Sequence, residues 1–147
     1  LEFRRVLFRS MQWDKTLNAG FSLASPEKLY IKQDESDDRP DAESQIADEN
    51  SLYNEIRKLI SIRRSHSALG NNSEIEFIYA EKNEYPLAFI RSSEDEKILV
   101  IINPADREVS FPCEYKPKEA VYSFGKEIAY EDKKITVPPC SAGFYRV

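Results

Sequence analysis

The hydrophobic pattern of this 147-residue chain changes its period near residue 70, which limits the folds that the chain can adopt. From residue 74 onward, apolar and polar residues alternate in short runs, as Ile75 and Phe77 do with Glu74 and Glu76. A two-residue period is typical of β-strands with one face in water, and short strands at this spacing favour an antiparallel sandwich or Greek-key sheet. The expected strands span residues 74–80, 87–91, 97–103, 108–112, 120–124, 127–130, 134–137 and 143–147.

One of these strands is expected to lie at the centre of its sheet. Residues 98–102 read Ile-Leu-Val-Ile-Ile, without a polar residue. A strand with one wet face would alternate, so this unbroken apolar run indicates a strand that is buried on both faces.

A helical period precedes the strands. Asp48 or Asn50 can cap the start of this helix, and a Leu-Gly-Asn-Asn sequence at residues 69–72 ends it, so we expect a helix over residues 49–66. His66, the only histidine, is expected to be a cation near the helix end. The residues at helical spacing on one apolar face are Leu52, Ile56, Leu59 and Ile60. That face needs a partner, which fits a chain cut from a larger body.

Residues 11–48 have no clear period. Residues 11–33 hold aromatic and turn residues, including an Asn-Ala-Gly turn at 18–20, and predict an ordered loop. Residues 34–49 are rich in Asp and Glu, with Arg39 alone opposing them. Their spacing fits no calcium-binding EF-hand loop and lacks its central glycine, so we expect a solvated surface loop.

Size and composition exclude several classes of protein. The chain is shorter than the roughly 250 residues of a complete (β/α)8 barrel. Its net charge of −5 argues against a nucleic-acid partner, because phosphate binding needs a basic surface. No apolar stretch approaches the roughly 20 residues of a membrane-spanning helix, so no membrane partner is expected.

The two cysteines bear on the cellular compartment and on cofactors. Cys113 and Cys140 lack the spacing of metal ligands, and two cysteines are too few for a disulfide scaffold. They predict reduced thiols in a cytoplasmic protein, with no metal site and no cofactor in this chain. A disulfide between them is the less favoured alternative.

The first ten residues are expected not to belong to the protein. The sequence LEFRRVLFRS resembles the translation of a common sequencing-library adapter from Glu2 to Ser10. Taken as protein, the segment could instead form a short basic amphipathic helix that touches anionic lipid. The adapter interpretation is favoured, and it implies that the reading frame was entered within a gene, with coding sequence missing upstream of Met11.

Four sequence blocks resemble the α-amylase superfamily, glycoside hydrolase family 13. Residues 11–22, MQWDKTLNAGFS, are similar to a block of oligo-1,6-glucosidases, α-glucosidases and trehalose synthases. Residues 24–32, ASPEKLYIK, resemble a motif of the trehalose synthases. Residues 49–69 resemble the last barrel helix of the family, and residues 137–147 resemble the end of its C-terminal β domain.

The resemblance implies a fragment of a larger fold. Its parts would be the last loop and helix of a (β/α)8 barrel, followed by an all-β antiparallel sandwich domain. The expected boundaries are 1–10 for the adapter-like artefact, 11–69 for the barrel loop and final helix, and 70–147 for the β domain.

The resemblance also implies an enzyme, a retaining α-glucoside hydrolase that acts on malto- or isomalto-oligosaccharides. Retention needs two carboxyl groups about 5 Å apart, and the family's catalytic acids lie upstream of the position of Met11. The fragment itself is therefore predicted to be inactive, with no catalytic residue.

One alternative function is that the chain is part of a trehalose synthase-type glucosyl isomerase or transferase. The other is a non-catalytic sugar-binding β-sandwich, for which the candidate ring platform is Tyr79, Tyr85, Tyr115, Tyr122, Tyr130 and Tyr145.

The first block carries the candidate substrate-binding residues, which are Gln12, Trp13, Asp14 and Asn18. Trp13 could offer an apolar face to a sugar ring, and the other three could offer polar groups near the mouth of the site. Loop packing is the alternative role for Trp13, and a tight turn with Gly20 is the alternative for Asn18. The family's substrate-side arginine has no counterpart here, because Arg9 lies inside the adapter-like segment.

Overall fold

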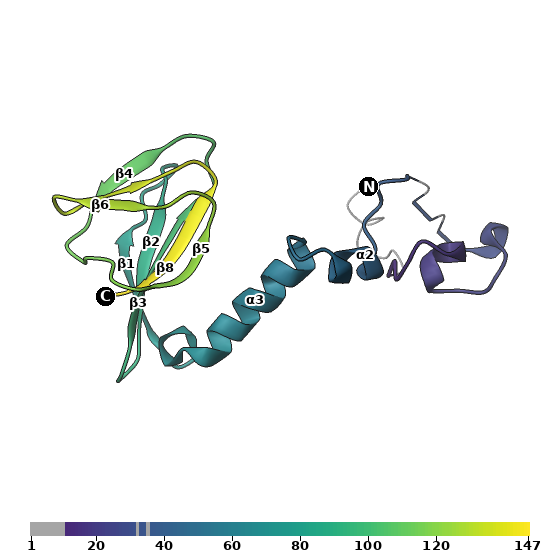
Figure 1. The fold of residues 1–147 in the computed structure, drawn as a ribbon, viewed down its shortest axis with the longest axis horizontal. Coiled ribbons are helices and arrows are strands. Elements are labelled where there is room, and N and C mark those ends of the chain that lie inside the picture. The colour runs from purple at the N-terminus through teal and green to yellow at the C-terminus, as the bar shows by residue number, and fades with distance from the viewer. Residues whose placement is uncertain (1–10, 32, 35) are drawn as a thin grey trace. The chain divides into compact units, whose positions relative to one another are not determined.

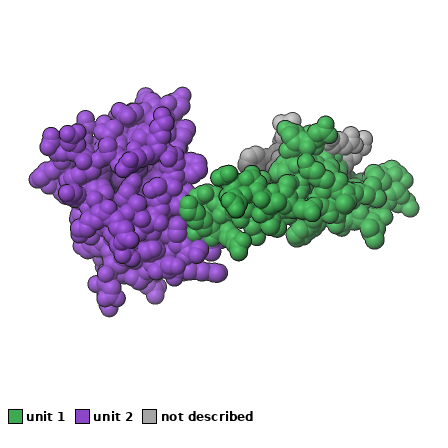
Figure 2. Space-filling model, viewed as in Figure 1, with its two compact units in different colours: residues 1–59 green, residues 60–147 purple. Residues whose placement is uncertain are grey.

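The computed structural model describes residues 11–31, 33–34 and 36–147. The predicted adapter-derived segment, residues 1–10, lies outside the described residues. The chain divides into two compact units, residues 1–59 and residues 60–147, which Figure 2 distinguishes by colour. The boundary between the units falls within the longest helix.

Two antiparallel sheets build most of the second unit (Figure 1). The larger sheet has the strand order β1-β2-β3-β8-β5, and the smaller has the order β4-β7-β6. Each strand overlaps a segment predicted from the sequence, so the predicted antiparallel β domain is confirmed. The strands are β1 (Glu74–Tyr79), β2 (Leu87–Ser92), β3 (Lys97–Asn103), β4 (Val109–Pro112), β5 (Ala120–Phe124), β6 (Ala129–Glu131), β7 (Lys134–Val137) and β8 (Ser141–Arg146).

Strand β3 lies at the centre of the five-stranded sheet, paired with β2 on one side and β8 on the other. Leu99 and Ile101 belong to the core that lies between the two sheets. Ile98 and Val100 point to the opposite face, where they pack with Ala68. Protein therefore covers both faces of this strand, as its unbroken apolar run predicts.

The first unit contains short helical elements and the start of the long helix. They are the 3-10 turns η1 (Leu17–Gly20) and η2 (Pro26–Lys28), helix α2 (Ala42–Ala47) and helix α3 (Leu52–Ser65), and η3 (Ser67–Leu69) follows α3 in the second unit. The helix predicted over residues 49–66 is confirmed as α3.

The predicted capping residue of α3 was wrong. The Ser51 hydroxyl accepts a hydrogen bond from the Asn54 N–H at 3.2 Å, the geometry of an N-cap. Asp48 instead accepts from the Asn50 N–H at 2.9 Å, because the chain makes a turn just before the helix. Serine is as good a cap as the two residues that the sequence suggested.

The acidic segment is not entirely a loop, which corrects a second prediction. Helix α2 occupies residues 42–47, and the Asp41 carboxylate caps it by accepting from the Ser44 N–H at 2.8 Å. Glu43 in the first turn adds a favourable charge at the helix N-terminus. A helix of this length has too few turns to show an apolar period, so its only sequence signals were the residues at its start.

Helix α3 leaves its apolar face in water. None of its residues is buried, and the side chains of Leu52, Ile56 and Ile60 are 72%, 47% and 47% exposed. The helix is thus stabilised by its backbone and its cap rather than by burial within the described part of the chain.

Candidate substrate-binding loop

The candidate loop, residues 11–24, turns on three successive residues with left-handed backbone angles. The φ angles of Asn18, Ala19 and Gly20 are 55°, 53° and 71°. Asparagine and glycine adopt this conformation readily, whereas alanine does so at a cost of about 1–2 kcal/mol. Ala19 is held there because its side chain is fully buried, its N–H donates to the Thr16 carbonyl and its carbonyl accepts from the Trp13 N–H, both at 2.9 Å.

Glycine at position 20 is also required for space. A Cβ atom there would lie 2.6 Å from Oδ2 of Asp14, well inside van der Waals contact. The Asp14 carboxylate cannot easily move away, because its Oδ1 accepts from the Thr16 N–H at 2.8 Å and from the Thr16 hydroxyl. The turn and the carboxylate therefore fit together only with glycine.

Asn18 lies inside the loop. Its side chain is 7% exposed, and its amide nitrogen donates to the Ser22 carbonyl at 2.8 Å and the Ala24 carbonyl at 2.7 Å. An asparagine amide has two N–H groups, and both are used on the loop's own backbone. Asn18 therefore shapes the loop and fastens its far side.

The N-terminus of α2 supports the first residues of the loop. The Ala42 N–H donates to the Gln12 carbonyl, and the Glu43 N–H donates to the Trp13 carbonyl, both at 2.9 Å. These two amides have no partner within their own helix, so the loop supplies acceptors that the helix start needs. The hydrogen bonds from Ser44 hold the pKa of Asp41 below its ordinary value.

The sequence did not reveal this support. The signal was present in Asp41, followed by an acid in the first turn and by Ser44 at the third position, which is typical of a helix start. It was passed over because the acidic residues around it favoured a solvated loop.

Trp13 and Gln12 present groups that the loop itself does not use. The Trp13 side chain is 53% exposed, so part of its ring is open to a ligand. The Oε1 atom of Gln12 is buried and has no hydrogen-bond partner among the described residues. Buried polar atoms in native proteins nearly always have a hydrogen-bond partner, so this oxygen is a free acceptor that a ligand or another part of the protein can use.

The structure thus brings all four candidate residues onto one loop with different surroundings. The Asn18 amide is buried and bonded within the loop, and one carboxylate oxygen of Asp14 is hydrogen-bonded to Thr16. The Trp13 ring is exposed, and the Gln12 Oε1 has no partner among the described residues. Within residues 11–31, 33–34 and 36–147, no cluster of three or more His, Cys, Asp or Glu side chains is placed to hold a metal ion.

Other described features bear on the class of protein. No helix in the described part of the chain combines the length and the apolar character that crossing a membrane requires. Cys113 is buried and Cys140 is exposed, and both are free thiols. Burial raises the pKa of the Cys113 thiol, as expected of a core cysteine.

Family models match nearly the whole chain in two consecutive parts. Residues 6–72 match the catalytic domain of α-amylases, and residues 75–143 match the C-terminal domain of maltogenic amylases. The chain belongs to the α-amylase family. The predicted fold class, the end of the catalytic domain followed by a C-terminal β domain, is confirmed by these matches and by related structures.

Several relatives of established structure or function resemble the chain along most of its length. Oligo-1,6-glucosidase from Parageobacillus thermoglucosidasius is 27% identical over 142 residues, which cover 93% of this chain and 24% of that protein. Glucan 1,6-α-glucosidase from Streptococcus pneumoniae is 26% identical, with coverage of 87% and 23%. The trehalulose synthase MutB from Pseudomonas mesoacidophila superposes with a TM-score of 0.75 at 27% identity, with coverage of 92% and 24%. The chain therefore spans about a quarter of the length of these relatives.

Proposed function

We propose that this α-amylase-family chain is part of a retaining α-glucoside hydrolase that acts on malto- or isomalto-oligosaccharides. The main support for this proposal is the order of the two domain matches, with the loop of residues 11–24 inside the catalytic-domain match. Relatives that bear the names oligo-1,6-glucosidase and probable α-glucosidase support this substrate class.

The chemistry itself is proposed to reside in the rest of the catalytic domain. A retaining mechanism needs a nucleophile and a general acid about 5 Å apart, and the acid needs a raised pKa. The pKa values of Asp41 and Glu96 are displaced in the opposite direction, downward, and hydrogen bonds to neighbouring groups are among the causes. The isolated chain is accordingly proposed to be inactive.

The loop is proposed to form part of the wall of the substrate site. The exposed ring of Trp13 can pack on the apolar face of a sugar, and the unpaired Oε1 of Gln12 can accept a hydrogen bond from a sugar hydroxyl or from a neighbouring loop. Asp14 can contact a hydroxyl through its second oxygen. Asn18 is proposed to act indirectly, by holding the turn that places the other three residues.

A glucosyl isomerase or transferase is the second candidate. The observation in its favour is that the similar solved structures include trehalulose synthases, with TM-scores of 0.75 and 0.76. Hydrolysis and isomerisation differ in how well water is kept from the covalent intermediate. That difference would be set by loops outside residues 11–147, so both activities remain compatible with the described part.

A non-catalytic sugar-binding sandwich gains little support. Stacking of sugars on a β domain needs exposed aromatic rings in one plane. Of the six candidate tyrosines, Tyr85 is the most exposed, at 46%, whereas Tyr122 is 6% exposed and the other four are partly buried. Tyr79 packs against Phe111 with the two ring planes 40° apart, so its ring is partly buried against the core rather than free to join a platform.

The location and the domain boundaries are also proposals. A cytoplasmic location is supported by the two free thiols, which suit a reducing compartment. A boundary near residue 70 is supported by the gap between the family matches at residues 72 and 75. The catalytic-domain match begins at residue 6, within the adapter-like segment, so the start of native sequence at residue 11 stays a prediction.

The test is an activity assay on two proteins with an aryl α-glucoside, followed by product analysis with oligosaccharides. The first protein is the purified 147-residue chain, for which we expect no turnover above buffer. The second is the longer protein encoded once the source DNA is read upstream of the Met11 codon, for which we expect hydrolysis. Turnover by the chain alone, or a longer protein that lacks both hydrolase and glucosyl-transfer activity, would contradict the proposal.

A matched pair of variants of the longer protein tests the loop. Trp13→Ala is expected to raise KM about tenfold, because a ring contact with the sugar is lost. Tyr30→Ala is the control for the loss of an aromatic side chain from the same unit, because Tyr30 lies outside residues 11–24, the loop proposed to form the wall. Equal effects of the two substitutions would show that Trp13 has no special contact with the substrate.

A further inference from the structure

One carboxylate fastens the connector that follows α3, residues 66–73, to the five-stranded sheet. Glu96 lies in the hairpin between β2 and β3, and its side chain is 13% exposed. Its Oε1 lies 2.7 Å from Nδ1 of His66 and accepts from Nε of Arg146 at 3.3 Å. Its Oε2 accepts from the Ala68 N–H at 3.3 Å. Glu96 therefore joins three parts of the chain that are distant in sequence.

Contacts from β2 and from the first residue of the hairpin hold the other side of the connector. Arg91 donates from Nη2 to the Gly70 carbonyl at 2.6 Å and from Nε to the Ala68 carbonyl at 3.3 Å. The hydroxyls of Ser67 and Ser93 lie 2.7 Å apart. Ala68 sits between these polar groups, and its side chain is fully buried against the sheet.

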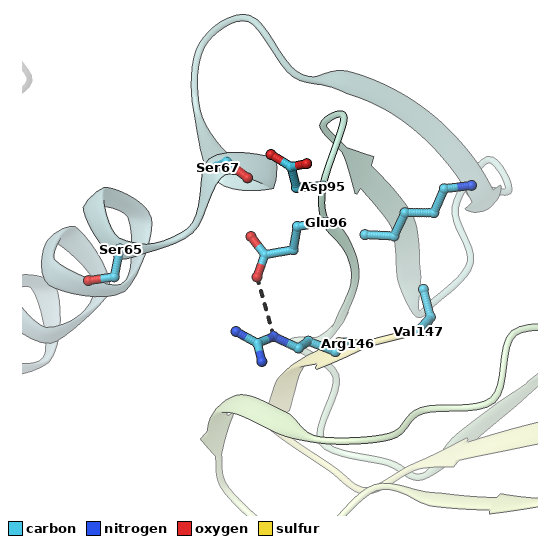
Figure 3. Close-up of a pocket in the computed structure, with 7 residues that line it drawn as sticks. Ser65, Ser67, Asp95, Glu96, Arg146 and Val147 are labelled. Carbon is cyan, nitrogen blue, oxygen red and sulfur yellow. Dashed lines mark hydrogen bonds and ion pairs between the residues drawn. The ribbon is translucent and has the colours of Figure 1, made fainter.

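Solvent reaches the carboxylate through a cleft beside it. The cleft has a volume of about 510 Å³ and is lined by the end of α3, the connector, the hairpin and the last two residues of the chain. Figure 3 shows Glu96 between Ser67 and Arg146, with the ion pair to Arg146 drawn. A proton can therefore reach Glu96 from this cleft while the sheet stays folded.

Titratable and charged groups lie around Glu96 on each neighbouring element. They are His66 on the connector, Arg146 on β8, Glu119 before β5, which pairs with Arg146 at 2.9 Å, Arg91 on β2, and Asp95 and Lys97 beside Glu96 itself. The nearest partners of the carboxylate are donors, so its charged form is the one that the surroundings favour.

We propose that Glu96 is an acid-released latch, which holds the connector on the sheet while it is charged and frees it when it is protonated. A protonated carboxyl loses its charge-assisted bonds to His66 and Arg146, which are about twice as strong as neutral ones. The connector then detaches locally from the sheet. The latch lies within residues 60–147 and does not depend on the proposed glycosidase function.

The direction of the pH effect follows from the surroundings of Glu96. Burial raises the pKa of Glu96, but the hydrogen bonds from His66 and the Ala68 N–H and the positive charges of His66 and Arg146 outweigh burial, so the pKa lies below its ordinary value. A carboxyl group of this kind stabilises the fold fully above its unfolded-state pKa. That contribution is lost as the pH falls through the lowered pKa of the folded state.

The experiment is amide hydrogen exchange of the 147-residue chain, resolved by residue and corrected for the pH dependence of intrinsic exchange. In the wild-type chain, protection of the Ala68 N–H should fall as the pH falls through the pKa of Glu96, while β3 stays protected. At neutral pH, Glu96→Gln should speed exchange at Ala68 about tenfold to hundredfold and remove its pH dependence. Glu94→Gln is the matched control, because Glu94 is an exposed acid of the same hairpin, and it should behave as the wild type.

Three outcomes would overturn the latch. In the first, Ala68 keeps its protection in Glu96→Gln while the sheet is intact. In the second, the pH dependence survives in that variant, so that another group is responsible. In the third, protection at Leu99 and Ile101 is lost together with that at Ala68, since the release would then be global unfolding rather than a local event.

Discussion

The two units of the molecule differ in where their apolar side chains lie. Among the described residues before position 60, Ala19 is the only buried hydrophobic residue, whereas the core of the second unit runs from Ala68 to Val137. The first unit exposes large apolar side chains, with Leu23 and Tyr30 exposed at 99% and 101%. Its order comes instead from hydrogen bonds, such as those of Asn18 and of the α2 N-terminus.

This difference indicates which of the two units can be stable without the rest of the protein. Burial of apolar surface is the main stabilising term in folding, and hydrogen bonds contribute about 1 kcal/mol each on balance. The second unit meets that requirement with a core shared by both sheets. The first unit does not, which fits a segment that packs on the rest of a catalytic domain.

The largest expected effect is on the core of the second unit. Leu99→Ala should lower the free energy of unfolding of this unit by about 3 kcal/mol, because it leaves a cavity in the fully buried central strand. Leu52→Ala on α3 should change it by less than about 0.5 kcal/mol, since Leu52 is already 72% exposed. Denaturant unfolding followed by circular dichroism measures both.

The comparison between the units would break if these two values were similar. A large loss from Leu52→Ala would mean that α3 is packed in solution, on another copy of the chain or on the β domain. Measuring the pair at two protein concentrations separates these cases, because only self-association depends on concentration.

The second unit was largely predictable because its signals are local. The apolar run at residues 98–102 predicted a buried strand, and this was confirmed. The alternation from Glu74 to Phe77 correctly predicted strand β1, but the expected burial of its apolar face was wrong, because Ile75 and Phe77 are 49% and 60% exposed. The pairing order of the strands was not predictable, since β8 enters between β3 and β5 through contacts distant in sequence. The latch at Glu96 was missed for the same reason: His66 and Glu96 are thirty residues apart.

The candidate loop was only partly predictable. The turn at Asn18 to Gly20 was recognisable from its residue types and is confirmed, and the structure adds that all three residues have left-handed backbone angles. The support from α2 was not recognised, because it joins Gln12 and Trp13 to residues 42 and 43 and because the helix is too short for a period. Whether Gln12, Trp13 and Asp14 contact a sugar stays a prediction, since the groups that would face them lie in other parts of the catalytic domain.

A smaller effect is expected in the first unit, where conformation rather than burial is at stake. Gly20→Ala should destabilise the loop by about 1–3 kcal/mol, because its φ is +71° and the new Cβ would meet the Asp14 carboxylate. Ala19→Gly should be close to neutral, since relief of its left-handed strain, about 1 kcal/mol, offsets the lost burial of a methyl group.

Amide exchange at Trp13, whose N–H donates to the Ala19 carbonyl, reports the state of the loop in both variants. Protection should fall in Gly20→Ala and be retained in Ala19→Gly. The opposite ranking would mean that packing of the Ala19 methyl group, rather than the left-handed turn, orders this unit. Both units would then be ordered mainly by apolar burial.

The smallest effect concerns the pH dependence of the first unit, through the cap of α2. Hydrogen bonds from Ser44 lower the pKa of Asp41 in the folded state, so its contribution is present above the unfolded pKa and is lost as the pH falls through the folded pKa. Acidification should therefore reduce exchange protection at the Ser44, Ala42 and Glu43 amides and loosen the loop that they support.

Asp41→Asn should retain the cap and abolish this dependence, because asparagine accepts the same bond without titrating. Asp38→Asn, an exposed acid of the same segment, should leave the wild-type dependence in place. If the pH dependence of protection is the same in both variants, contacts other than the α2 cap order the loop. The first unit would then not be ordered mainly by the hydrogen bonds described above.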